Sequence, residues 1–304
     1  SVGGAGIQAD IKTISLLGVY PCTVITAITA QNTRGISHIL PIDAYTIRKQ
    51  IDSILSDISV DSIKIGVVTN DKIISVISDS LIHKKIPIVL DPIISSTSGT
   101  IFLPHTFLKE FKRSLIPLSD LVTPNIPEAE LLSGIEILNE SNLEEAANYI
   151  LELGAKNVII KGGHMNDNKT IFNILINKKG EKRSFPNSRI VGEKFHGSGC
   201  NFSSAVAALL ARKYSISESC YYANILISKS FRNVVKIGKG MPIISPYFSI
   251  YDSASKYEVI QELDRALNSL MKIESFTNLI PETQTNFVYA LPLAKEISDV
   301  AGID

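Results

Sequence analysis

Residues 196–208 read His-Gly-Ser-Gly-Cys-Asn-Phe-Ser-Ser-Ala-Val-Ala-Ala, so two glycines flank a serine and a cysteine stands where an apolar helix begins. Glycine lets the backbone turn sharply, and several N–H groups can then point at one spot. The helix N-terminus behind them adds partial positive charge. The segment therefore predicts an anion hole formed by Gly197, Ser198, Gly199 and the N–H of Cys200.

Such a hole stabilises a phosphoryl group in transit, because the charge of that group is spread over its outer oxygens. The same position lowers the pKa of a cysteine, so we expect Cys200 to act as a base or as a nucleophile. Taken alone, the segment fits a glycine-rich turn that caps a helix around a small buried residue equally well.

Short β-branched runs alternate with amphipathic stretches along the chain. The runs predict strands at 22–28, 62–68, 86–91, 120–123, 157–161 and 170–176. The amphipathic stretches predict helices at 7–17, 44–55, 72–82, 128–132, 143–153, 201–213 and 216–234. Apolar strands separated by helices indicate an α/β fold with a mostly parallel sheet covered on both faces. Such a sheet binds its ligands beyond the carboxyl ends of its strands.

Composition excludes several classes of protein. The chain has 304 residues and a formal net charge of zero, with no basic stripe, so we expect no nucleic-acid partner. It has no run of about 18 apolar residues and no signal-peptide pattern, so we expect no membrane partner. Three widely separated cysteines favour neither a disulfide framework nor a zinc site and fit the reducing cytoplasm.

Four further segments lie just after predicted strands or at helix starts. They read Gly-Gly-Ala-Gly-Ile-Gln-Ala-Asp-Ile-Lys-Thr (3–13), Ala-Ile-Thr-Ala-Gln-Asn-Thr-Arg-Gly-Ile (27–36), Thr-Pro-Asn-Ile-Pro-Glu-Ala-Glu (123–130) and Val-Ile-Ile-Lys-Gly-Gly-His (158–164). Together with residues 196–201 they closely resemble the hydroxymethylpyrimidine and hydroxymethylpyrimidine-phosphate kinases of thiamine biosynthesis, which are ribokinase-like. The resemblance covers about residues 1–245.

The resemblance implies ATP-dependent phosphorylation of the hydroxymethyl group of an aminopyrimidine, followed by phosphorylation of the monophosphate to the diphosphate. ATP and Mg²⁺ are the implied cofactors. The implied partners are the small-molecule substrate and a second copy of the chain, since relatives are often dimers. Cys200 stands at the base position, where most ribokinase relatives have aspartate.

Asn125 and Glu128 are candidates for the magnesium and nucleotide site. Their spacing of three puts them on one face of a helix, where an amide and a carboxylate can hold the waters around magnesium. Asn125 as a helix cap with Glu128 as its capping partner is the alternative. Asp91, at the end of a predicted strand, is a weaker metal candidate. Lys161 can reach the ATP phosphates as a point charge, or it is a solvated strand end.

Asp10 and Gln31 are candidates for the pyrimidine, because a carboxylate and an amide match an edge with ring-nitrogen acceptors and an amine donor. Gly6 allows close backbone approach, and Val67 occupies a position where relatives often place methionine against the ring. The alternatives are surface polar residues for Asp10 and Gln31 and a plain core residue for Val67.

Three features accompany or depart from the family pattern. Relatives commonly read Ala-Lys-Ser-Gly where residues 96–99 read Ser-Thr-Ser-Gly, so Thr97 replaces a lysine and we expect weaker phosphate contacts or a weaker second phosphorylation. Relatives also carry a strand before the glycine-rich loop, which we expect to be missing from the chain shown. Cys22, in a predicted strand, and Cys220, in a predicted helix, are expected to be buried hydrophobic residues.

Residues 246–304 differ in pattern from the rest of the chain. Serines, a proline and an aspartate predict a linker to residue 255, and apolar spacing predicts a helix over 256–275. Residues 277–292 resemble the start of the thiamine-phosphate synthase domain that archaeal members fuse to this kinase. A C-terminal helix with an ordered tail is the alternative.

Two other functions remain open. A pyridoxal or pyridoxine kinase is the closest enzyme alternative, because some members of the family accept such rings. A thiamine-responsive regulator is the non-enzyme alternative, since synthase-like domains also occur joined to DNA-binding domains. The sequence shows no helix-turn-helix pattern and no basic patch, which argues against the regulator.

Overall fold

The structure is a computed structural model that describes residues 2–96, 98–164, 170–188, 195, 197–231, 234–273, 275, 287–291, 294 and 297–303. It divides into two compact units, Ser1–Pro246 and Tyr247–Asp304. Thr97, His196 and most of the segment that resembles the synthase domain lie outside the described residues.

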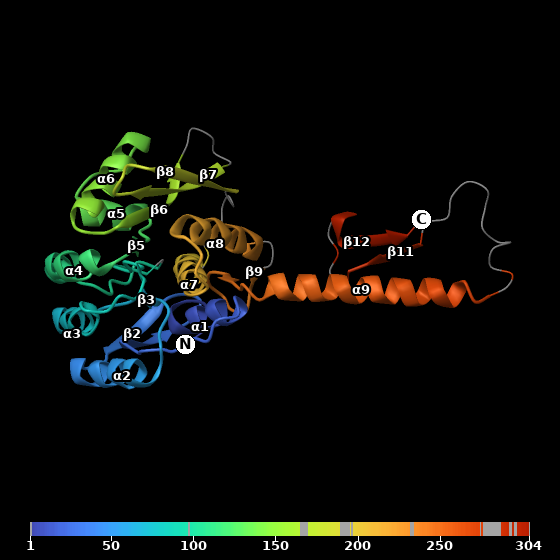
Figure 1. The fold of residues 1–304 in the computed structure, drawn as a ribbon, viewed down its shortest axis with the longest axis horizontal. Coiled ribbons are helices and arrows are strands. Elements are labelled where there is room, and N and C mark those ends of the chain that lie inside the picture. Colours follow the sequence, from blue (N-terminus) through green and yellow to red (C-terminus); the bar gives the residue numbers. More distant parts are fainter. Residues whose placement is uncertain are drawn as a thin grey trace. The chain divides into compact units, whose positions relative to one another are not determined.

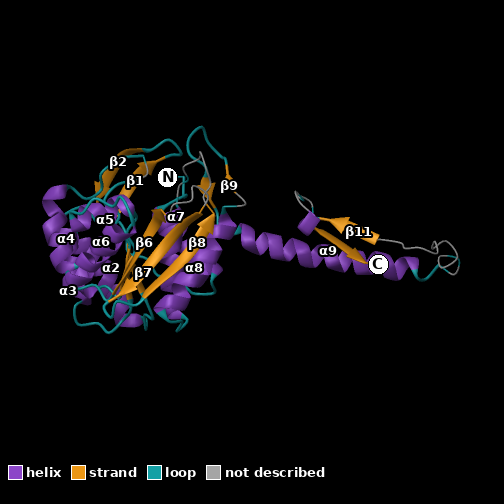
Figure 2. Cartoon of the chain, turned by 90° about the horizontal axis from the view of Figure 1, so that it is seen from above, coloured by secondary structure: helices purple, strands orange, loops and turns teal. Residues whose placement is uncertain are grey.

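The first unit is built around a six-stranded sheet in the order β3-β4-β5-β6-β7-β8 (Figures 1 and 2). The strands are β3 (Ile63–Ile65), β4 (Ile88–Leu90), β5 (Leu121–Val122), β6 (Asn157–His164), β7 (Thr170–Asn177) and β8 (Lys182–Ser188). Strands β3 to β6 pair in parallel, whereas β7 and β8 pair antiparallel at one edge. The prediction of an α/β fold with a mostly parallel sheet is confirmed. Strand β8 was not predicted, because its sequence, Lys-Arg-Ser-Phe-Pro-Asn-Ser, has a single large apolar residue, Phe185, and shows no apolar run.

The sheet separates two hydrophobic cores, because successive residues of a strand point to opposite faces. Leu90, Val122 and Ile160 face one core, and their neighbours Val89, Leu121 and Ile159 face the other. Both faces are covered, so the central strands carry no polar side and read as continuous apolar runs.

Helices fill both faces (Figures 1 and 2). The first core takes apolar residues from α2 (Ala44–Asp57), α3 (Asp71–Leu81), α4 (Leu108–Ser114), α5 (Ile126–Ser133) and α6 (Glu140–Glu152). The second takes them from α7 (Ser198–Ala211) and α8 (Ile216–Ser230), with α1 (Gly6–Leu16) bonded to α7 through Thr13 and Asn201. All seven helices predicted for this unit are present. Helix α4, about two turns long, was missed because so short a stretch shows little periodicity.

Two small hairpins complete the first unit: β1 (Ala27–Gln31) with β2 (Ile36–Pro41), and β9 (Val234–Val235) with β10 (Ile243–Ile244). They are joined through Thr33, whose carbonyl accepts from the Met241 N–H and whose hydroxyl accepts from the Gly240 N–H. Ile243 packs against Gly4. Residues that precede the second unit thus support the glycine-rich loop at the start of the chain.

The strand predicted at 22–28 is largely wrong, because only Ala27 and Ile28 belong to β1. Cys22 therefore has no strand to bury it, and it is exposed, contrary to the expectation. Cys220 is buried in α8, as expected.

The second unit contains α9 (Phe248–Leu270) and a hairpin of β11 (Phe287–Ala290) with β12 (Val300–Ile303). Val259 and Leu263 of α9 are buried. The predicted helix is present but begins at Phe248, so the prediction of a linker to residue 255 is wrong. Serine and aspartate cost a helix only a few tenths of a kcal/mol each, so polar residues there did not prevent helix formation. None of the helices in the described part of the chain is long and apolar enough to cross a membrane.

Candidate functional site

Helix α7 starts at the glycine-serine-glycine turn, and this turn requires Gly197. Its φ of +93° lies in the left-handed region, and a Cβ there would lie 2.0 Å from the Gly4 carbonyl oxygen. The N-cap Gly197 offers no capping side chain, so the first N–H groups of α7 are left for another partner.

Helix α1 starts in the same way, with Ala5 as an N-cap that has no capping side chain. Most other helices of the unit begin with a side chain that accepts a hydrogen bond from the helix: Asp43, Asn70, Asn125, Asn139 and Ser215. The backbone of Gly6 hydrogen-bonds the sulfur of Cys200. The two uncapped helix starts therefore meet at Cys200, where their partial positive charges favour an anion.

Two buried lysines lie near this point. Lys64 Nζ, from β3, lies 2.8 Å from Asp10 Oδ1 and 3.0 Å from Oδ2. Lys161 Nζ, from β6, lies 3.0 Å from Asp91 Oδ1, and a Cβ on Gly199 would meet it at 3.2 Å. Lys161 thus lies against the glycine-serine-glycine turn at Gly199 and is not the solvated strand end considered from the sequence, since its side chain is 14% exposed.

Helix α7 holds both carboxylates of these pairs. Ser204 Oγ donates to Asp10 Oδ1 at 2.7 Å, and Ser203 Oγ donates to Asp91 Oδ2 at 3.0 Å. Thr123 Oγ1 adds a bond of 3.2 Å to Asp91 Oδ1. Both oxygens of Asp91 therefore have protein partners, and the geometry favours holding Lys161 over binding a metal.

The Asp91–Lys161 pair stays charged at neutral pH. Burial disfavours both charges, but Lys161 and then Lys64 outweigh it and lower the pKa of Asp91. For Lys161 the negative charges of Asp91 and Glu128 outweigh burial and raise its pKa. The site therefore presents a fixed ammonium next to the start of α7.

The expected low pKa of Cys200 is contradicted. Burial raises the pKa of this thiol to about 11, with Asp91 and Asp10 acting in the same direction. Lys64 and the Gly6 backbone lower it, but by less. Desolvation of the thiolate outweighs the helix N-terminus, which the sequence interpretation did not weigh. Cys200 is thus a protonated thiol in the substrate-free protein.

Asn125 and Glu128 form a capping box at the start of α5, which was the alternative interpretation of this pair. Asn125 Oδ1 accepts from the Glu128 N–H, and Glu128 Oε2 accepts from the Asn125 N–H, both at 2.9 Å. The Lys161 N–H donates to the Pro124 carbonyl, which fixes the helix start beside β6. Burial raises the pKa of Glu128 to about 7, although Lys161 opposes the shift.

The capping box occupies one oxygen of Glu128 and leaves Oε1 for a cation or a water molecule. Within the described residues no group of three His, Cys, Asp or Glu side chains could hold a metal ion. Magnesium keeps much of its water shell and commonly binds through one or two carboxylates plus substrate phosphates. A single hard oxygen on a buried carboxyl fits that mode of binding.

The pyrimidine candidates are less closely grouped. Gly6 has a φ of +63°, and no atom lies within 4 Å of where a Cβ would be, so a ligand could approach its backbone. The Gln31 carbonyl accepts from the Val2 N–H, next to the glycine-rich loop, and the Val67 carbonyl accepts from Thr26 Oγ1. Asp10 belongs to the cluster but is bonded to Lys64 and Ser204.

Lys64, Ser203 and Ser204 were not singled out from the sequence. A lone lysine inside the apolar run 63–68 is the signal that could have found the first. The two serines on an otherwise apolar helix are the corresponding signal for the others, because a buried hydroxyl needs a partner.

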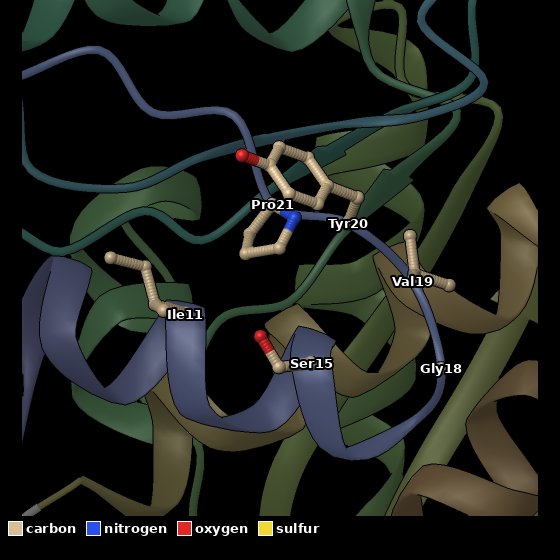
Figure 3. Close-up of a pocket in the computed structure, with 6 residues that line it drawn as sticks. All are labelled: Ile11, Ser15, Gly18, Val19, Tyr20 and Pro21. Atoms are coloured by element: carbon tan, nitrogen blue, oxygen red, sulfur yellow. The ribbon is translucent and has the colours of Figure 1, made fainter.

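A separate surface hollow of about 570 Å³ lies between α1 and the loop that follows it (Figure 3). It is lined by Ile11, Ser15, Gly18, Val19, Tyr20 and Pro21. None of these residues belongs to the cluster around Cys200.

Residues 1–245 match the family described as phosphomethylpyrimidine kinase, and residues 262–304 match that described as thiamine-phosphate synthase ThiN. The chain is 37% identical over 240 residues to the hydroxymethylpyrimidine/phosphomethylpyrimidine kinase of Staphylococcus aureus MRSA252, covering 78% of this chain and 87% of the relative. It is 39% identical over 241 residues to the thiamine biosynthesis bifunctional protein ThiED of Geobacter sulfurreducens, covering 79% of this chain. The match spans about half, 49%, of that relative.

Solved structures of related kinases have a similar fold. The phosphomethylpyrimidine kinase of Clostridium difficile 630 superposes with a TM-score of 0.66 at 37% identity, covering 76% of this chain and 94% of that one. The pyridoxal kinase of Bacillus subtilis, in an ADP complex, gives 0.72 at 30% identity, covering 81% and 93%. The Staphylococcus aureus pyridoxal kinase with AMP-PCP gives 0.72 at 28% identity, covering 80% and 89%. The predicted ribokinase-like fold is confirmed.

Proposed function

Because this chain belongs to the phosphomethylpyrimidine kinase family, we propose that the cluster around Cys200 is the place where it transfers the phosphoryl group. Its activity is that of a hydroxymethylpyrimidine/phosphomethylpyrimidine kinase in thiamine biosynthesis. The kinase part of the chain is fused to a segment that resembles thiamine-phosphate synthase. The observation that carries the assignment of the site is the meeting of two uncapped helix starts at one thiol, with a buried ammonium beside it.

Cys200 is the proposed base. Its thiolate takes the proton of the substrate hydroxymethyl group while that oxygen bonds to the γ-phosphorus of ATP, and the bond to ADP breaks. The N–H groups of Gly197, Ser198, Gly199 and Cys200 point at the transferred group, whose negative charge they stabilise. Lys161, held by Asp91, adds a point charge there.

Glu128 is the proposed protein ligand for magnesium or its water, and Asn125 orients it through the capping box. When bound, magnesium neutralises charge on the nucleotide phosphates. Glu128 must lose its proton to bind a cation, and its raised pKa makes this step depend on pH near neutrality. Asp91 remains a weaker metal candidate, because its oxygens are bonded to protein groups.

Gly6, Gln31 and Val67 are proposed to contact the pyrimidine. Gly6 supports this through its open left-handed backbone and its bond to Cys200. Asp10 could contact the ring amine with its carboxylate while it holds Lys64, since each carboxylate oxygen has two lone pairs.

A kinase assay tests the assignment of the site. Hydroxymethylpyrimidine and its monophosphate are each incubated with ATP and magnesium, and the products are resolved by mass. The parent chain should form the diphosphate from both substrates, and Cys200→Ala should form little of either product. Full activity of a folded Cys200→Ala variant would remove Cys200 from the mechanism.

Pyridoxal kinase activity is a second candidate function, because the Bacillus subtilis pyridoxal kinase superposes with the higher TM-score, 0.72 against 0.66. Competition between pyridoxal and hydroxymethylpyrimidine in a steady-state assay separates the two. We expect pyridoxal to be the weaker substrate, because sequence identity favours the pyrimidine kinases at 37% against 30%.

We also propose that the protein forms a homodimer and that the kinase activity resides in one part of the chain. Exposed apolar side chains on and beside the β1–β2 hairpin support an interface between copies: Tyr20, Ile25, Ile28, Leu40 and Tyr45. Residues 1–245 are proposed as the kinase domain, and 246–304 as a segment that contains helix α9 and the synthase-like part. Sedimentation of the parent and of a Tyr20→Lys variant tests the interface, which predicts dissociation of the variant.

A further inference from the structure

Lys64 is a buried cation that the family assignment does not explain. It lies between Ile63 and Ile65 in β3, and its side chain is only 6% exposed. Burial of an ammonium is unfavourable unless it is paired. Lys64 Nζ meets both oxygens of Asp10, at 2.8 and 3.0 Å, and Ser204 Oγ binds the same carboxylate at 2.7 Å. The ammonium is therefore held in one position by α1 and α7.

That position lies beside Cys200. Ser204 follows Cys200 by four residues in α7, so the two side chains lie on one face of the helix. Asp10 follows Gly6 by four residues in α1, and the Gly6 backbone bonds the sulfur. Both helices thus bring the ion pair and the thiol to the same side.

Charged groups from four elements act on the thiol. Lys64 from β3 favours the thiolate, whereas Asp91 after β4 and Asp10 from α1 disfavour it. Lys161 from β6 also lies close enough for Cys200 to raise the pKa of its ammonium. Burial has the largest effect on the thiol, and among the neighbouring charges Lys64 has the largest.

We propose that Lys64 is a positioning residue of the phosphoryl transfer, whose ammonium, fixed by Asp10 and Ser204, supplies the positive charge beside which Cys200 loses its proton. This inference rests on the proposed role of Cys200 as the base. The S–H bond breaks and its proton passes to solvent. The thiolate then accepts the hydroxymethyl proton as the new P–O bond forms and the bond to ADP breaks.

The test measures the thiol directly, in a Cys22→Ser background that removes the exposed cysteine; Cys220 is buried and stays unreactive. The rate of alkylation of Cys200 by iodoacetamide is followed against pH in the substrate-free protein. Lys64→Met should move the midpoint of this pH profile, which reports the pKa of Cys200, to higher pH. Asp10→Asn should move it to lower pH, because it removes a negative charge and leaves the ammonium.

Opposite shifts of the alkylation midpoint in Lys64→Met and Asp10→Asn distinguish an electrostatic role of Lys64 from a purely structural role of the ion pair. If the Lys64–Asp10 pair only joins β3 to α1, both variants break the same contact and should move the alkylation midpoint in the same direction. Shifts of the same sign, or no shift, would overturn the proposal.

A second variant covers the case in which Lys64→Met fails to fold because Asp10 is left unpaired. Lys64→Met/Asp10→Leu replaces both charges by apolar groups, a change that proteins often tolerate. It should still raise the midpoint, because Lys64 acts on the thiol more strongly than Asp10. In this variant kcat should fall about tenfold or more while KM for ATP is unchanged; a parent-like kcat would overturn the proposal. Activity of Cys200→Ala would refute the base itself, whereas the titration reports on Lys64 independently.

Discussion

Gly197→Ala should inactivate the kinase while leaving it folded. A Cβ at this position would lie 2.0 Å from the Gly4 carbonyl oxygen, whereas real Cβ contacts are essentially never below 3.0 Å. The loop of Gly4 or the start of α7 must therefore move by at least about 1 Å, the difference between these distances. Gly4 has little room to yield, because Ile243 lies so close that a Cβ on Gly4 would meet it at 2.9 Å.

The expected loss follows from that displacement. A misplacement of about 1 Å in a catalytic site costs about 10²-fold in rate, or about 2.7 kcal/mol of transition-state stabilisation. The left-handed φ of +93° adds about 1–2 kcal/mol of backbone strain, which destabilises the folded state. We therefore expect kcat/KM for hydroxymethylpyrimidine to fall about 100-fold and the free energy of unfolding to fall by a few kcal/mol.

The measurements are steady-state kinetics and urea unfolding, with Gly180→Ala as the matched control. Gly180 has a φ of +77°, and nothing lies within 4 Å of its Cβ position, so this variant has the strain without the collision. It should lose about 1 kcal/mol of stability and keep the parent kcat/KM. A folded Gly197→Ala variant within threefold of the parent kcat/KM would refute the steric argument, as would an equal loss in Gly180→Ala.

Four further predictions concern the base, the buried carboxyl (two of them) and the C-terminal part of the chain. Cys200→Ala should lower kcat by roughly 10²-fold or more at unchanged stability, and Cys200→Ser should also be poor because a hydroxyl is harder to deprotonate; turnover within a few-fold of the parent would contradict the role. Glu128→Gln should raise the magnesium concentration needed for half-maximal rate, and a titration that overlays the parent would reduce Glu128 to a cap. The folded pKa of Glu128, about 7, lies above the ordinary value of 4.5 for a glutamate, so the folded state binds more protons between these values. Stability of the metal-free parent should therefore fall as pH rises through this window, a dependence that urea unfolding should not find in Glu128→Gln. A chain ending at Pro246 should keep the kinase rate, whereas a chain ending at Ile237 should lose it. The shorter chain lacks Gly240, Met241 and Ile243, which contact Thr33 and Gly4. Equal rates of the two chains would contradict the role of these contacts in holding the glycine-rich loop.

Much of the fold could be predicted from the sequence. The central strands are apolar on both faces and most helices carry one apolar stripe, so local periodicity located them to within a few residues. The exceptions have local causes. Strand β8 is at the edge and mostly polar, α4 is short, and residues 22–26 are rich in β-branched side chains but belong to no strand.

For the candidate site, too, some features could be predicted from the sequence and others only from the tertiary structure. The sequence by itself determined the family and placed Cys200 at a helix start and Lys161 at a strand end, because glycines and helix starts act through neighbouring residues; the anion hole stays a prediction. Only the tertiary structure decided which charges meet: Lys64 with Asp10, 54 residues apart, and Lys161 with Asp91, 70 apart. It also decided the protonation of Cys200, since the pKa of a thiol depends on desolvation and on charges from several elements. Burial and distant pairing are properties of the packed chain, and no local pattern of residues encodes them.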